Sequence, residues 1–415
     1  NLGIFGTETS VTFAFLEATG VVFSEALPKS DLVQSIIKGK KLTEAEKLTI
    51  AQLFAEDGLS FNNELMPVGI AIQIPEIGGF SFTWKEKISG DAVLNPAFAD
   101  LVFNGVNSKY IDSVIIDAQG FLTGYTDTLL PYSNYFNGSS LQFSWTRNFN
   151  ISYGRKIIEL DGITIYGGGG INFIQGNAVT DISYTENSAS GFAAYSSVFD
   201  IDYAALTNPS LDLNGNLYPV GRGFAIDLGG TVSIKDKIWA GISLTNMGSM
   251  KWNGNLVSLN DGIFDSVVNF IGVNSADIYS DIASLINAGG LFNWSEQSEI
   301  KQSLPAQLRI GGAISPVDRL EIGVDIIQPL NKNPGSIQST LFAGLVSFTP
   351  VEWIKLTSGF AGGGIANLDI PFGVSFSFTP QQAWQLSIGT RDIVSFFRQD
   401  TPTLSLSISL LRFRM

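Results

Sequence analysis

Large apolar residues alternate with small or polar residues over short stretches of this chain. Phe372, Val374, Phe376 and Phe378, for example, are separated by glycine and serine. Neighbouring side chains of a β-strand point to opposite faces, so each stretch predicts a strand with one apolar face and one small or polar face. The same pattern predicts strands at residues 11–23, 68–74, 80–87, 113–122, 141–150, 163–175, 224–228, 238–244, 308–314, 320–326, 384–391 and 404–410.

A tight turn of the type Ser/Thr-Pro-x-Asp/Glu/Gln recurs between the later stretches, at residues 315–318, 349–352 and 379–382. Its prolines are 34 and then 30 residues apart. This spacing leaves room for two strands of roughly ten residues, one tight turn and one longer connection. Each unit is therefore predicted to be a β-hairpin.

Composition decides between a soluble β-sandwich and a membrane barrel, since alternation is compatible with both. The chain has 45% hydrophobic residues and a mean hydropathy of +0.21, but only 15% charged residues, against about 25% in typical soluble domains. It contains no apolar run of about eighteen residues that could form a membrane helix. In lipid, only a closed barrel then satisfies every backbone polar group.

We therefore expect an all-β protein, a closed antiparallel transmembrane β-barrel in the bacterial outer membrane. About 14 strands are expected, with 16 as the alternative, because an even number brings both chain ends to the periplasm. The whole chain, 1–415, is predicted to be one barrel. No signal peptide is visible at its start, so we expect the numbering to begin at or after a cleavage site.

Three insertions are expected to interrupt the strands. Residues 25–64 are predicted to be a helical insertion, with a capping box at Thr43 and Glu46. Residues 177–221 are predicted to form a long loop, and residues 248–303 a long loop with helices. Because short turns of such barrels face the periplasm and long loops face outward, we expect the Ser/Thr-Pro turns in the periplasm and the two long insertions, 177–221 and 248–303, outside the cell.

Apolar residues at helical spacing within 248–303 define a candidate partner surface. They could instead pack on one another or cover the mouth of the barrel. The residues in question are Phe264, Val268, Ile271, Ile278, Ile282 and Leu285.

Charged residues at inward positions define a candidate polar cluster in the lumen. Charges of mixed sign on neighbouring strands are expected to pair and fill the lumen, or alternatively to line a solute path. The cluster consists of Asp227, Arg309, Glu321, Asp325 and Lys355. Four tryptophans near strand ends are expected to form an aromatic girdle at the lipid interface; these are Trp145, Trp239, Trp353 and Trp384.

The residue types that are missing narrow the chemistry. The chain has no cysteine and no histidine, which excludes Ser-His and Cys-His nucleophile systems and imidazole metal sites. We therefore predict no catalytic residue, no cofactor and no metal site, and a protein that is not an enzyme. A net charge of −14 and a pI near 4.5 also argue against nucleic acid as a partner.

Several segments carry a resemblance to a known family. They read FTWKEK at 82–87, LNP at 94–96, LVFNG at 101–105 and GRGFAIDLG at 221–229. With the hairpin spacing and the helical insertion, the chain resembles an uncharacterised family of Bacteroidota outer-membrane barrels. That family is similar in turn to FadL-like barrels, including the PorV and PorQ proteins of the type IX secretion system. The resemblance implies about 14 strands, a plugged lumen and a lateral route for hydrophobic solutes, and it offers no catalytic residue.

Three functions remain open at this point. The first is an accessory subunit of an envelope assembly or secretion complex, with outer-membrane lipid and envelope proteins as partners. The second is FadL-like transport of hydrophobic small molecules, and the third is a general porin. A porin usually needs an open, charged constriction, which an inner face rich in glycine and serine does not indicate.

Overall fold

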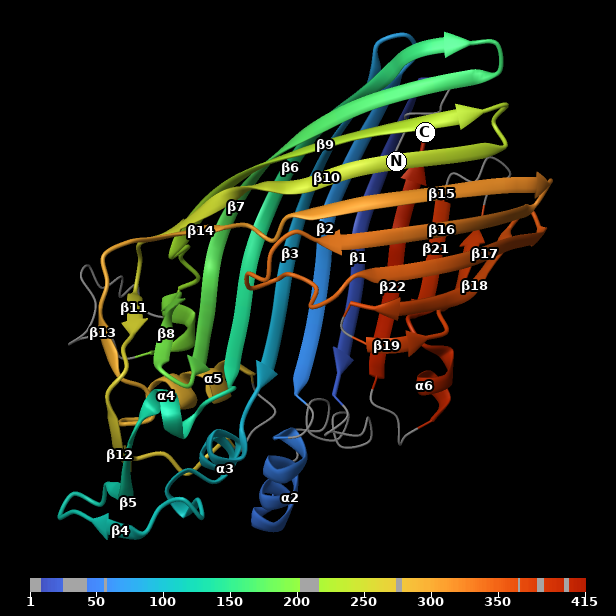
Figure 1. Cartoon of the computed structure of the whole chain (residues 1–415). Helices are drawn as coiled ribbons and strands as arrows, with labels where there is room; N and C mark the ends of the chain where they lie inside the picture. Colours follow the sequence, from blue (N-terminus) through green and yellow to red (C-terminus); the bar gives the residue numbers. More distant parts are fainter. Residues whose placement is uncertain are drawn as a thin grey trace.

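The computed structural model describes residues 9–24, 43–55, 58–201, 216–273, 278–364, 366–378, 384–398 and 403–415. Within these ranges, fourteen antiparallel strands pair in a ring, and the last strand pairs with the first. The predicted closed barrel and the lower of the two strand numbers are thus confirmed (Figure 1).

The wall strands follow one another in chain order, and each pairs with the next. They are β1 (Ser10–Phe23), β2 (Leu59–Ile74), β3 (Gly78–Val93), β6 (Ser140–Leu160), β7 (Ile163–Thr185), β9 (Gly221–Ile234), β10 (Ile238–Trp252), β15 (Gln307–Val317), β16 (Leu320–Pro329), β17 (Leu341–Val351), β18 (Ile354–Gly363), β20 (Phe372–Ser377), β21 (Trp384–Thr390) and β22 (Thr403–Arg414).

The register separates an apolar outer face from a polar lumen. Ile242, Ile310, Ile326 and Phe342 lie side by side on four neighbouring strands, and all four are exposed. The next residues along these strands form a row of glycine, aspartate and alanine that lines the interior. A barrel with oily side chains outside and small or polar ones inside suits a bilayer.

The two ends of the barrel differ. One end, here the turn end, carries tight turns, and Val11 and Met415 exchange backbone hydrogen bonds of 2.8 Å there. The Ser-Pro and Thr-Pro pairs predicted as turns belong to β15 and β17, where each forms a β-bulge. The turns that follow are two residues long, Asp318–Arg319 and Glu352–Trp353, and not the predicted four. The predicted turn at 379–382 lies outside the described residues.

The opposite end, here the cap end, carries the helices and a separate small sheet (Figure 1). That sheet has the order β12 (Ile263–Val268), β5 (Leu122–Pro131) and β4 (Ser113–Ile116). The strand predicted at 113–122 is therefore in the cap and not in the wall. None of the helices in the described part of the chain has the length and hydropathy of a membrane-spanning helix.

The insertions differ in their bounds from the predicted ranges. In the first, the capping box of Thr43 and Glu46 is present and starts α2 (Glu44–Phe54). However, β2 already begins at Leu59, so the last six residues of 25–64 are wall strand, and 25–42 lie outside the described residues. The range 177–221 starts as a hairpin of β7 with β8 (Ser188–Tyr195), so its first part is not a loop.

The range 248–303 holds more strand than helix. It contains β11 (Leu256–Leu259), β12, α5 (Ile278–Ile286), β13 (Trp294–Glu296) and β14 (Ile300–Ser303). The helical spacing of the apolar residues from Phe264 to Ile271 is misleading, because this segment is not a helix and its first part belongs to β12. A bulge between Phe264 and Ser266 shifts the side-chain alternation, so Phe264 and Val267 are both buried although they are three residues apart.

An aromatic core holds the cap together. Phe136 is fully buried, and its ring lies 4.5 Å from that of Phe98 and 5.5 Å from that of Phe264. Phe98 belongs to α3 (Pro96–Asn104), where Asn95 accepts a hydrogen bond from the Phe98 N–H at 2.8 Å and donates to the carbonyl of Tyr135 at 2.9 Å. Asn95 therefore caps α3 and also fastens it to the rest of the cap.

Candidate functional site in the lumen and the barrel wall

The lumen contains a cavity of ≈ 680 Å³ whose lining is rich in glycine. Four consecutive glycines, residues 167–170, lie on the wall strand β7 and are part of the lining of this cavity. A methyl group on Gly170 would come within 2.7 Å of the Ser152 hydroxyl, so the glycine permits a close approach of neighbouring side chains. Other glycines of the lining are Gly79, Gly154, Gly229, Gly230, Gly241, Gly311, Gly312 and Gly323.

The predicted polar residues form two ion pairs and a separate carboxylate. Arg309 Nε lies 2.9 Å from Asp325 Oδ1, and Lys355 Nζ lies 3.8 Å from Glu321 Oε2. Asp227, Arg309, Glu321 and Asp325 line the large cavity, whereas Lys355 and Glu321 line a second cavity of ≈ 450 Å³ near the turn end.

Asp227 is held by amides. Its carboxylate accepts from the side-chain amides of Asn172 at 2.7 Å and Asn150 at 3.2 Å, and from the backbone N–H of Asn246 at 2.7 Å. Asn150 and Asn172 are register partners on β6 and β7. These two asparagines were not among the predicted lumen residues, although strand alternation already placed both of them on the inward face of neighbouring strands.

Two further groups of inward charged residues on neighbouring strands were also not predicted from the sequence. Arg412 Nη2 lies 2.6 Å from Glu17 Oε1, across the seam between the first and last strands. Glu64 lies 2.6 Å from Lys85 and 3.3 Å from Lys87. These ion pairs connect neighbouring wall strands on the lumen side.

The connection between β16 and β17 crosses the barrel. This plug segment (residues 330–340) reaches the opposite wall, where Gln142 of β6 donates to the carbonyl of Lys332 at 3.0 Å and Ser89 of β3 lies near Gly335. Six strand-to-strand steps separate β3 from β16 around the wall. The plug segment therefore obstructs straight passage along the lumen.

Side-chain amides hold the plug segment in place. Asn331 donates to the carbonyl of Leu304, and Asn333 donates to that of Ser303, both at 2.7 Å. Leu304 in turn belongs to a buried apolar cluster with Met250 and Trp252 of β10. This cluster fills space inside the wall near the cap end.

The wall is low at β20 and β21. Within the described residues these strands have six and seven residues, against 21 and 23 in β6 and β7, and a tilted strand needs about 9–11 residues to cross the bilayer core. Pairing of β18 with β20 stops at Ser358 and resumes at Ala361 with β19 (Ala366–Asp369). Opposite this break lies Pro371, which has no N–H to donate.

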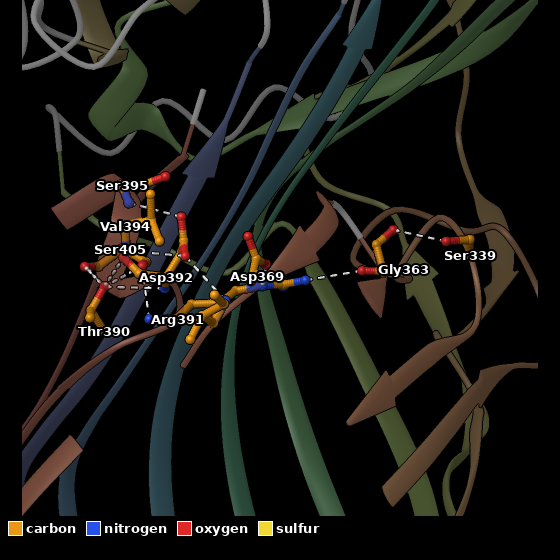
Figure 2. A network of polar contacts seen from close by, with 11 residues as sticks. Ser339, Gly363, Asp369, Thr390, Arg391, Asp392, Val394, Ser395 and Ser405 are labelled. Atoms are coloured by element: carbon orange, nitrogen blue, oxygen red, sulfur yellow. Dashed lines mark hydrogen bonds and ion pairs between the residues drawn. The ribbon is translucent and has the colours of Figure 1, made fainter. Parts of the chain in front are cut away.

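Side chains close the low wall where the backbone ladder is missing (Figure 2). The Arg391 guanidinium pairs with the Asp369 carboxylate and donates from Nη2 to the carbonyl of Gly363 at 3.0 Å. The Asp392 carboxylate accepts from the backbone N–H of Ile370 at 3.1 Å and of Ser395 at 2.9 Å.

A short helix completes this closure. Asp392 caps α6 (Ile393–Phe397), and the Ile393 N–H donates to the carbonyl of Ile370 at 2.8 Å. The helix leaves Phe396 48% and Phe397 78% exposed. Such aromatic exposure fits contact with acyl chains beside the low wall.

The low wall and the plug segment meet at one turn. Ser339 of the plug segment donates to the carbonyl of Gly364 at 3.4 Å, next to the Gly363 carbonyl that Arg391 holds (Figure 2). The plug segment and the closure of the low wall thus contact the same Gly363–Gly364 turn.

The four predicted girdle tryptophans divide into two pairs. Trp384 stacks on Phe413 with ring centroids 6.1 Å apart and packs at a tilt on Phe378 at 4.7 Å, and Trp353 stacks on Phe376 at 6.5 Å. Both tryptophans are exposed near the turn end. Their role at the lipid interface stays a prediction.

For the other pair, a girdle position is wrong. Trp145 is 9% exposed, donates to Glu86 at 3.0 Å and packs in the cap core. Trp239 lines the lumen cavity, because Ile238 and Ala240 take the outward positions on β10. Closeness to a strand end does not give the face on which a side chain lies.

The candidate partner surface is also revised. Phe264 is fully buried against Tyr132, Tyr135 and Phe136, so it cannot contact a partner. Val268 and Ile271 are exposed and Leu285 is partly buried. The side chains of Ile278 and Ile282 lie outside the described residues.

A closed barrel with an apolar exterior, an exposed aromatic cluster and a polar lumen defines an integral protein of the bacterial outer membrane. The chain belongs to a family of unknown function, DUF5723, whose model matches residues 21–387. No curated protein matches the chain.

Solved structures that resemble the chain are outer-membrane channels and transporters. A mutant of the TodX monoaromatic hydrocarbon channel is 10% identical to this chain, with a TM-score of 0.42. The match covers 99% of this chain and 89% of the TodX chain. The Ralstonia pickettii toluene transporter TbuX is 8% identical, with a TM-score of 0.42 and coverages of 100% and 90%. A Pseudomonas aeruginosa FadL homologue is 8% identical, with a TM-score of 0.35 and coverages of 98% and 87%.

Proposed function

We propose that this barrel transports hydrophobic small molecules and releases them sideways into the membrane through the low wall. The observation that carries the proposal is the length of β20 and β21, which are shorter than the bilayer core requires. At this place the barrel is closed by side chains and by α6 instead of a continuous strand ladder.

The plug segment supports a lateral path over an axial one. It connects opposite walls, so an axial path would require its displacement. The lumen cavity is lined by glycines and by the charged residues Asp227, Arg309, Glu321 and Asp325, whereas the outer face of the wall is apolar. Leaving sideways keeps a hydrophobic molecule in an apolar environment, which the hydrophobic effect favours.

A disulfide across the low wall tests this proposal. The chain has no cysteine, and the 2.8 Å hydrogen bond between Ile393 and Ile370 brings their backbones within reach of a disulfide. We expect the oxidised Ile370→Cys, Ile393→Cys variant to lose uptake of the hydrophobic dye N-phenyl-1-naphthylamine in proteoliposomes, and reduction to restore it. The two single-cysteine variants are the controls. Equal uptake before and after oxidation would contradict lateral release.

A second candidate is a non-enzymatic accessory subunit that binds a protein partner in an envelope assembly. The resemblance to PorV-like barrels of Bacteroidota type IX secretion implies this role. The specific observation in its favour is an apolar strand edge on the cap, since Val114, Ile115 and Ile116 are all exposed there. Purification in mild detergent distinguishes the two candidates: a stoichiometric partner protein supports the accessory role, and a lone barrel with bound hydrocarbon supports transport.

A further inference from the structure

One edge of the small cap sheet is open. β4 pairs with β5 on one side, from Ser113 opposite Tyr125 to Ile116 opposite Leu122. No strand of the described residues pairs with its other side. Figure 1 shows β4 at the outer tip of the cap, far from the chain termini and the turn end.

This edge is apolar on both faces of the sheet. Val114, Ile115 and Ile116 are 47%, 57% and 66% exposed, and Phe121 in the following turn is exposed as well. Edge strands of natural proteins are usually protected by charges, prolines or a covering element. Three consecutive exposed β-branched residues without such protection mark a surface that another strand can cover.

The backbone of β4 is oriented to accept such a strand. The Asp117 N–H donates to the carbonyl of Phe121 at 3.1 Å, which makes these two residues a hydrogen-bonded pair. Because hydrogen-bonded pairs alternate along antiparallel strands, Ser113 and Ile115 also point their backbone groups toward β5. Val114 and Ile116 therefore point theirs toward the open edge.

The charges around the edge specify the occupant. Asp112 and Asp117 flank β4, and both carboxylates are anchored: Asp112 accepts from the Asp127 N–H at 2.7 Å, and Asp117 accepts from the Phe121 N–H at 2.8 Å. Lys109 is the nearest basic residue along the chain, and its Nζ lies over the ring of Tyr110. An incoming strand with basic residues at its ends would complement this acidic frame.

We propose that β4 takes up an extended segment of another polypeptide as a fourth strand of the sheet. The segment is apolar in its middle and carries lysine or arginine at both ends. Main-chain hydrogen bonds to Val114 and Ile116 provide the attachment, and Asp112 and Asp117 provide the charge preference. This inference rests on the second function candidate, the partner-binding role, and is independent of transport.

A pair of peptides tests the inference on the full chain in nanodiscs. One fluorescent peptide alternates valine and threonine and has lysine at both ends; its twin has glutamate at both ends. We expect fluorescence anisotropy at low salt to show about tenfold tighter binding of the lysine peptide, since each exposed ion pair is weak but both terminal charges change from attraction to repulsion. The Asp112→Asn, Asp117→Asn variant should bind both peptides alike.

A proline variant tests the mode of attachment. Val114→Pro removes an outward N–H and should abolish binding of the lysine peptide, whereas Leu129→Ser, at an exposed apolar position away from the edge, should leave binding unchanged. Equal binding of the two peptides to the unaltered protein, or full binding to Val114→Pro, would overturn the inference. A dimer that Val114→Pro dissociates would identify a second copy as the occupant and would overturn it too.

Dye uptake by the same variants separates this result from the transport proposal. Both edge variants lie in the cap, so we expect their uptake to match that of the unaltered protein. Failure of the unaltered protein to prefer the lysine peptide, with intact dye uptake, would overturn the inference alone, whereas unchanged uptake after oxidation in the disulfide experiment would overturn the transport proposal alone.

Discussion

Arg391 donates to the carbonyl oxygen of Gly363 at 3.0 Å. This hydrogen bond joins the end of β21 to the end of β18 at a height of the wall that β20, the strand between them, does not reach. The same guanidinium pairs with Asp369, whose side chain is only 3% exposed. One side chain thus replaces part of a β-ladder. In the same turn, the carbonyl of Gly364 accepts a hydrogen bond from Ser339 of the plug segment. The residues that close the wall and the segment that crosses the lumen therefore contact the same turn.

Loss of Arg391 should weaken the barrel. Arg391→Gln leaves the buried Asp369 carboxylate without its charge partner, which typically costs about 3–5 kcal/mol. We expect a lower temperature for the change in gel mobility that marks barrel unfolding, together with faster dye uptake. Lys156→Gln is the control, because its pair with Glu159 is exposed at the turn end and exposed pairs contribute little to stability. An equal change in both variants would argue against a special role for Arg391.

Removal of the plug segment should open the lumen. Replacing residues 332–338 by a short glycine linker deletes the contact with Gln142 and the donor of Asn333. We expect single-channel currents in planar bilayers, where the unaltered barrel is expected to be silent. Gln119→Ala, at an exposed turn of the cap, serves as a control that should stay silent. A silent deletion variant would show that other groups close the lumen.

Asp227→Asn should lower the stability of the barrel, and a second substitution in the same hydrogen-bond network should restore part of that stability. Asp227→Asn can turn an amide donor toward the donors of Asn150 and Asn172, and an unsatisfied buried donor costs about 1–3 kcal/mol. Adding Asn172→Asp returns one carboxylate to the network. We expect thermal unfolding of the double variant to lie above that of Asp227→Asn. If the two unfold alike, the asparagine network contributes little.

The cap should loosen in acid through Asp261. Partial burial raises the pKa of this carboxyl, but hydrogen bonds from Ser133 and from the Gly262 N–H outweigh it and leave the pKa below its ordinary value. A lowered pKa in the folded state means that the stabilisation is complete above the unfolded value of about 3.9 and is lost as the pH falls through the folded value. We expect amide exchange at Ser133 and Gly262, corrected for intrinsic rates, to accelerate below about pH 4. Asp261→Asn should remove this pH dependence; its persistence would point to another group.

The tryptophans should differ in their contact with lipid. Trp353 and Trp384 are exposed on the aromatic cluster near the turn end, whereas Trp239 faces the lumen. In variants that keep one tryptophan each, we expect brominated lipids to quench Trp353 and Trp384 strongly and Trp239 weakly. Strong quenching of Trp239 would mean that its strand has the opposite face toward the membrane.

Local alternation was enough to predict most strands of the wall, the apolar exterior and the inward charges such as Arg309 and Asp325, because a strand's side-chain period depends only on the backbone. It did not distinguish the cap strand within 113–122 from a wall strand. It was not enough for positions where a bulge shifts that period. Phe264 was expected on a partner surface and is buried in the cap, since the bulge at β12 brings it to the same face as Val267.

The amino-acid sequence by itself therefore determined that the chain forms a barrel, and it also set the mixture of charges in the lumen. Only the tertiary structure decided how the barrel is closed. The plug segment meets Gln142 from more than 180 residues away, and Arg391 meets Gly363 where two short strands leave the wall incomplete. Such contacts depend on the ring of fourteen strands bringing opposite walls together, and a pattern with a period of two residues contains no information about which strands end up facing each other.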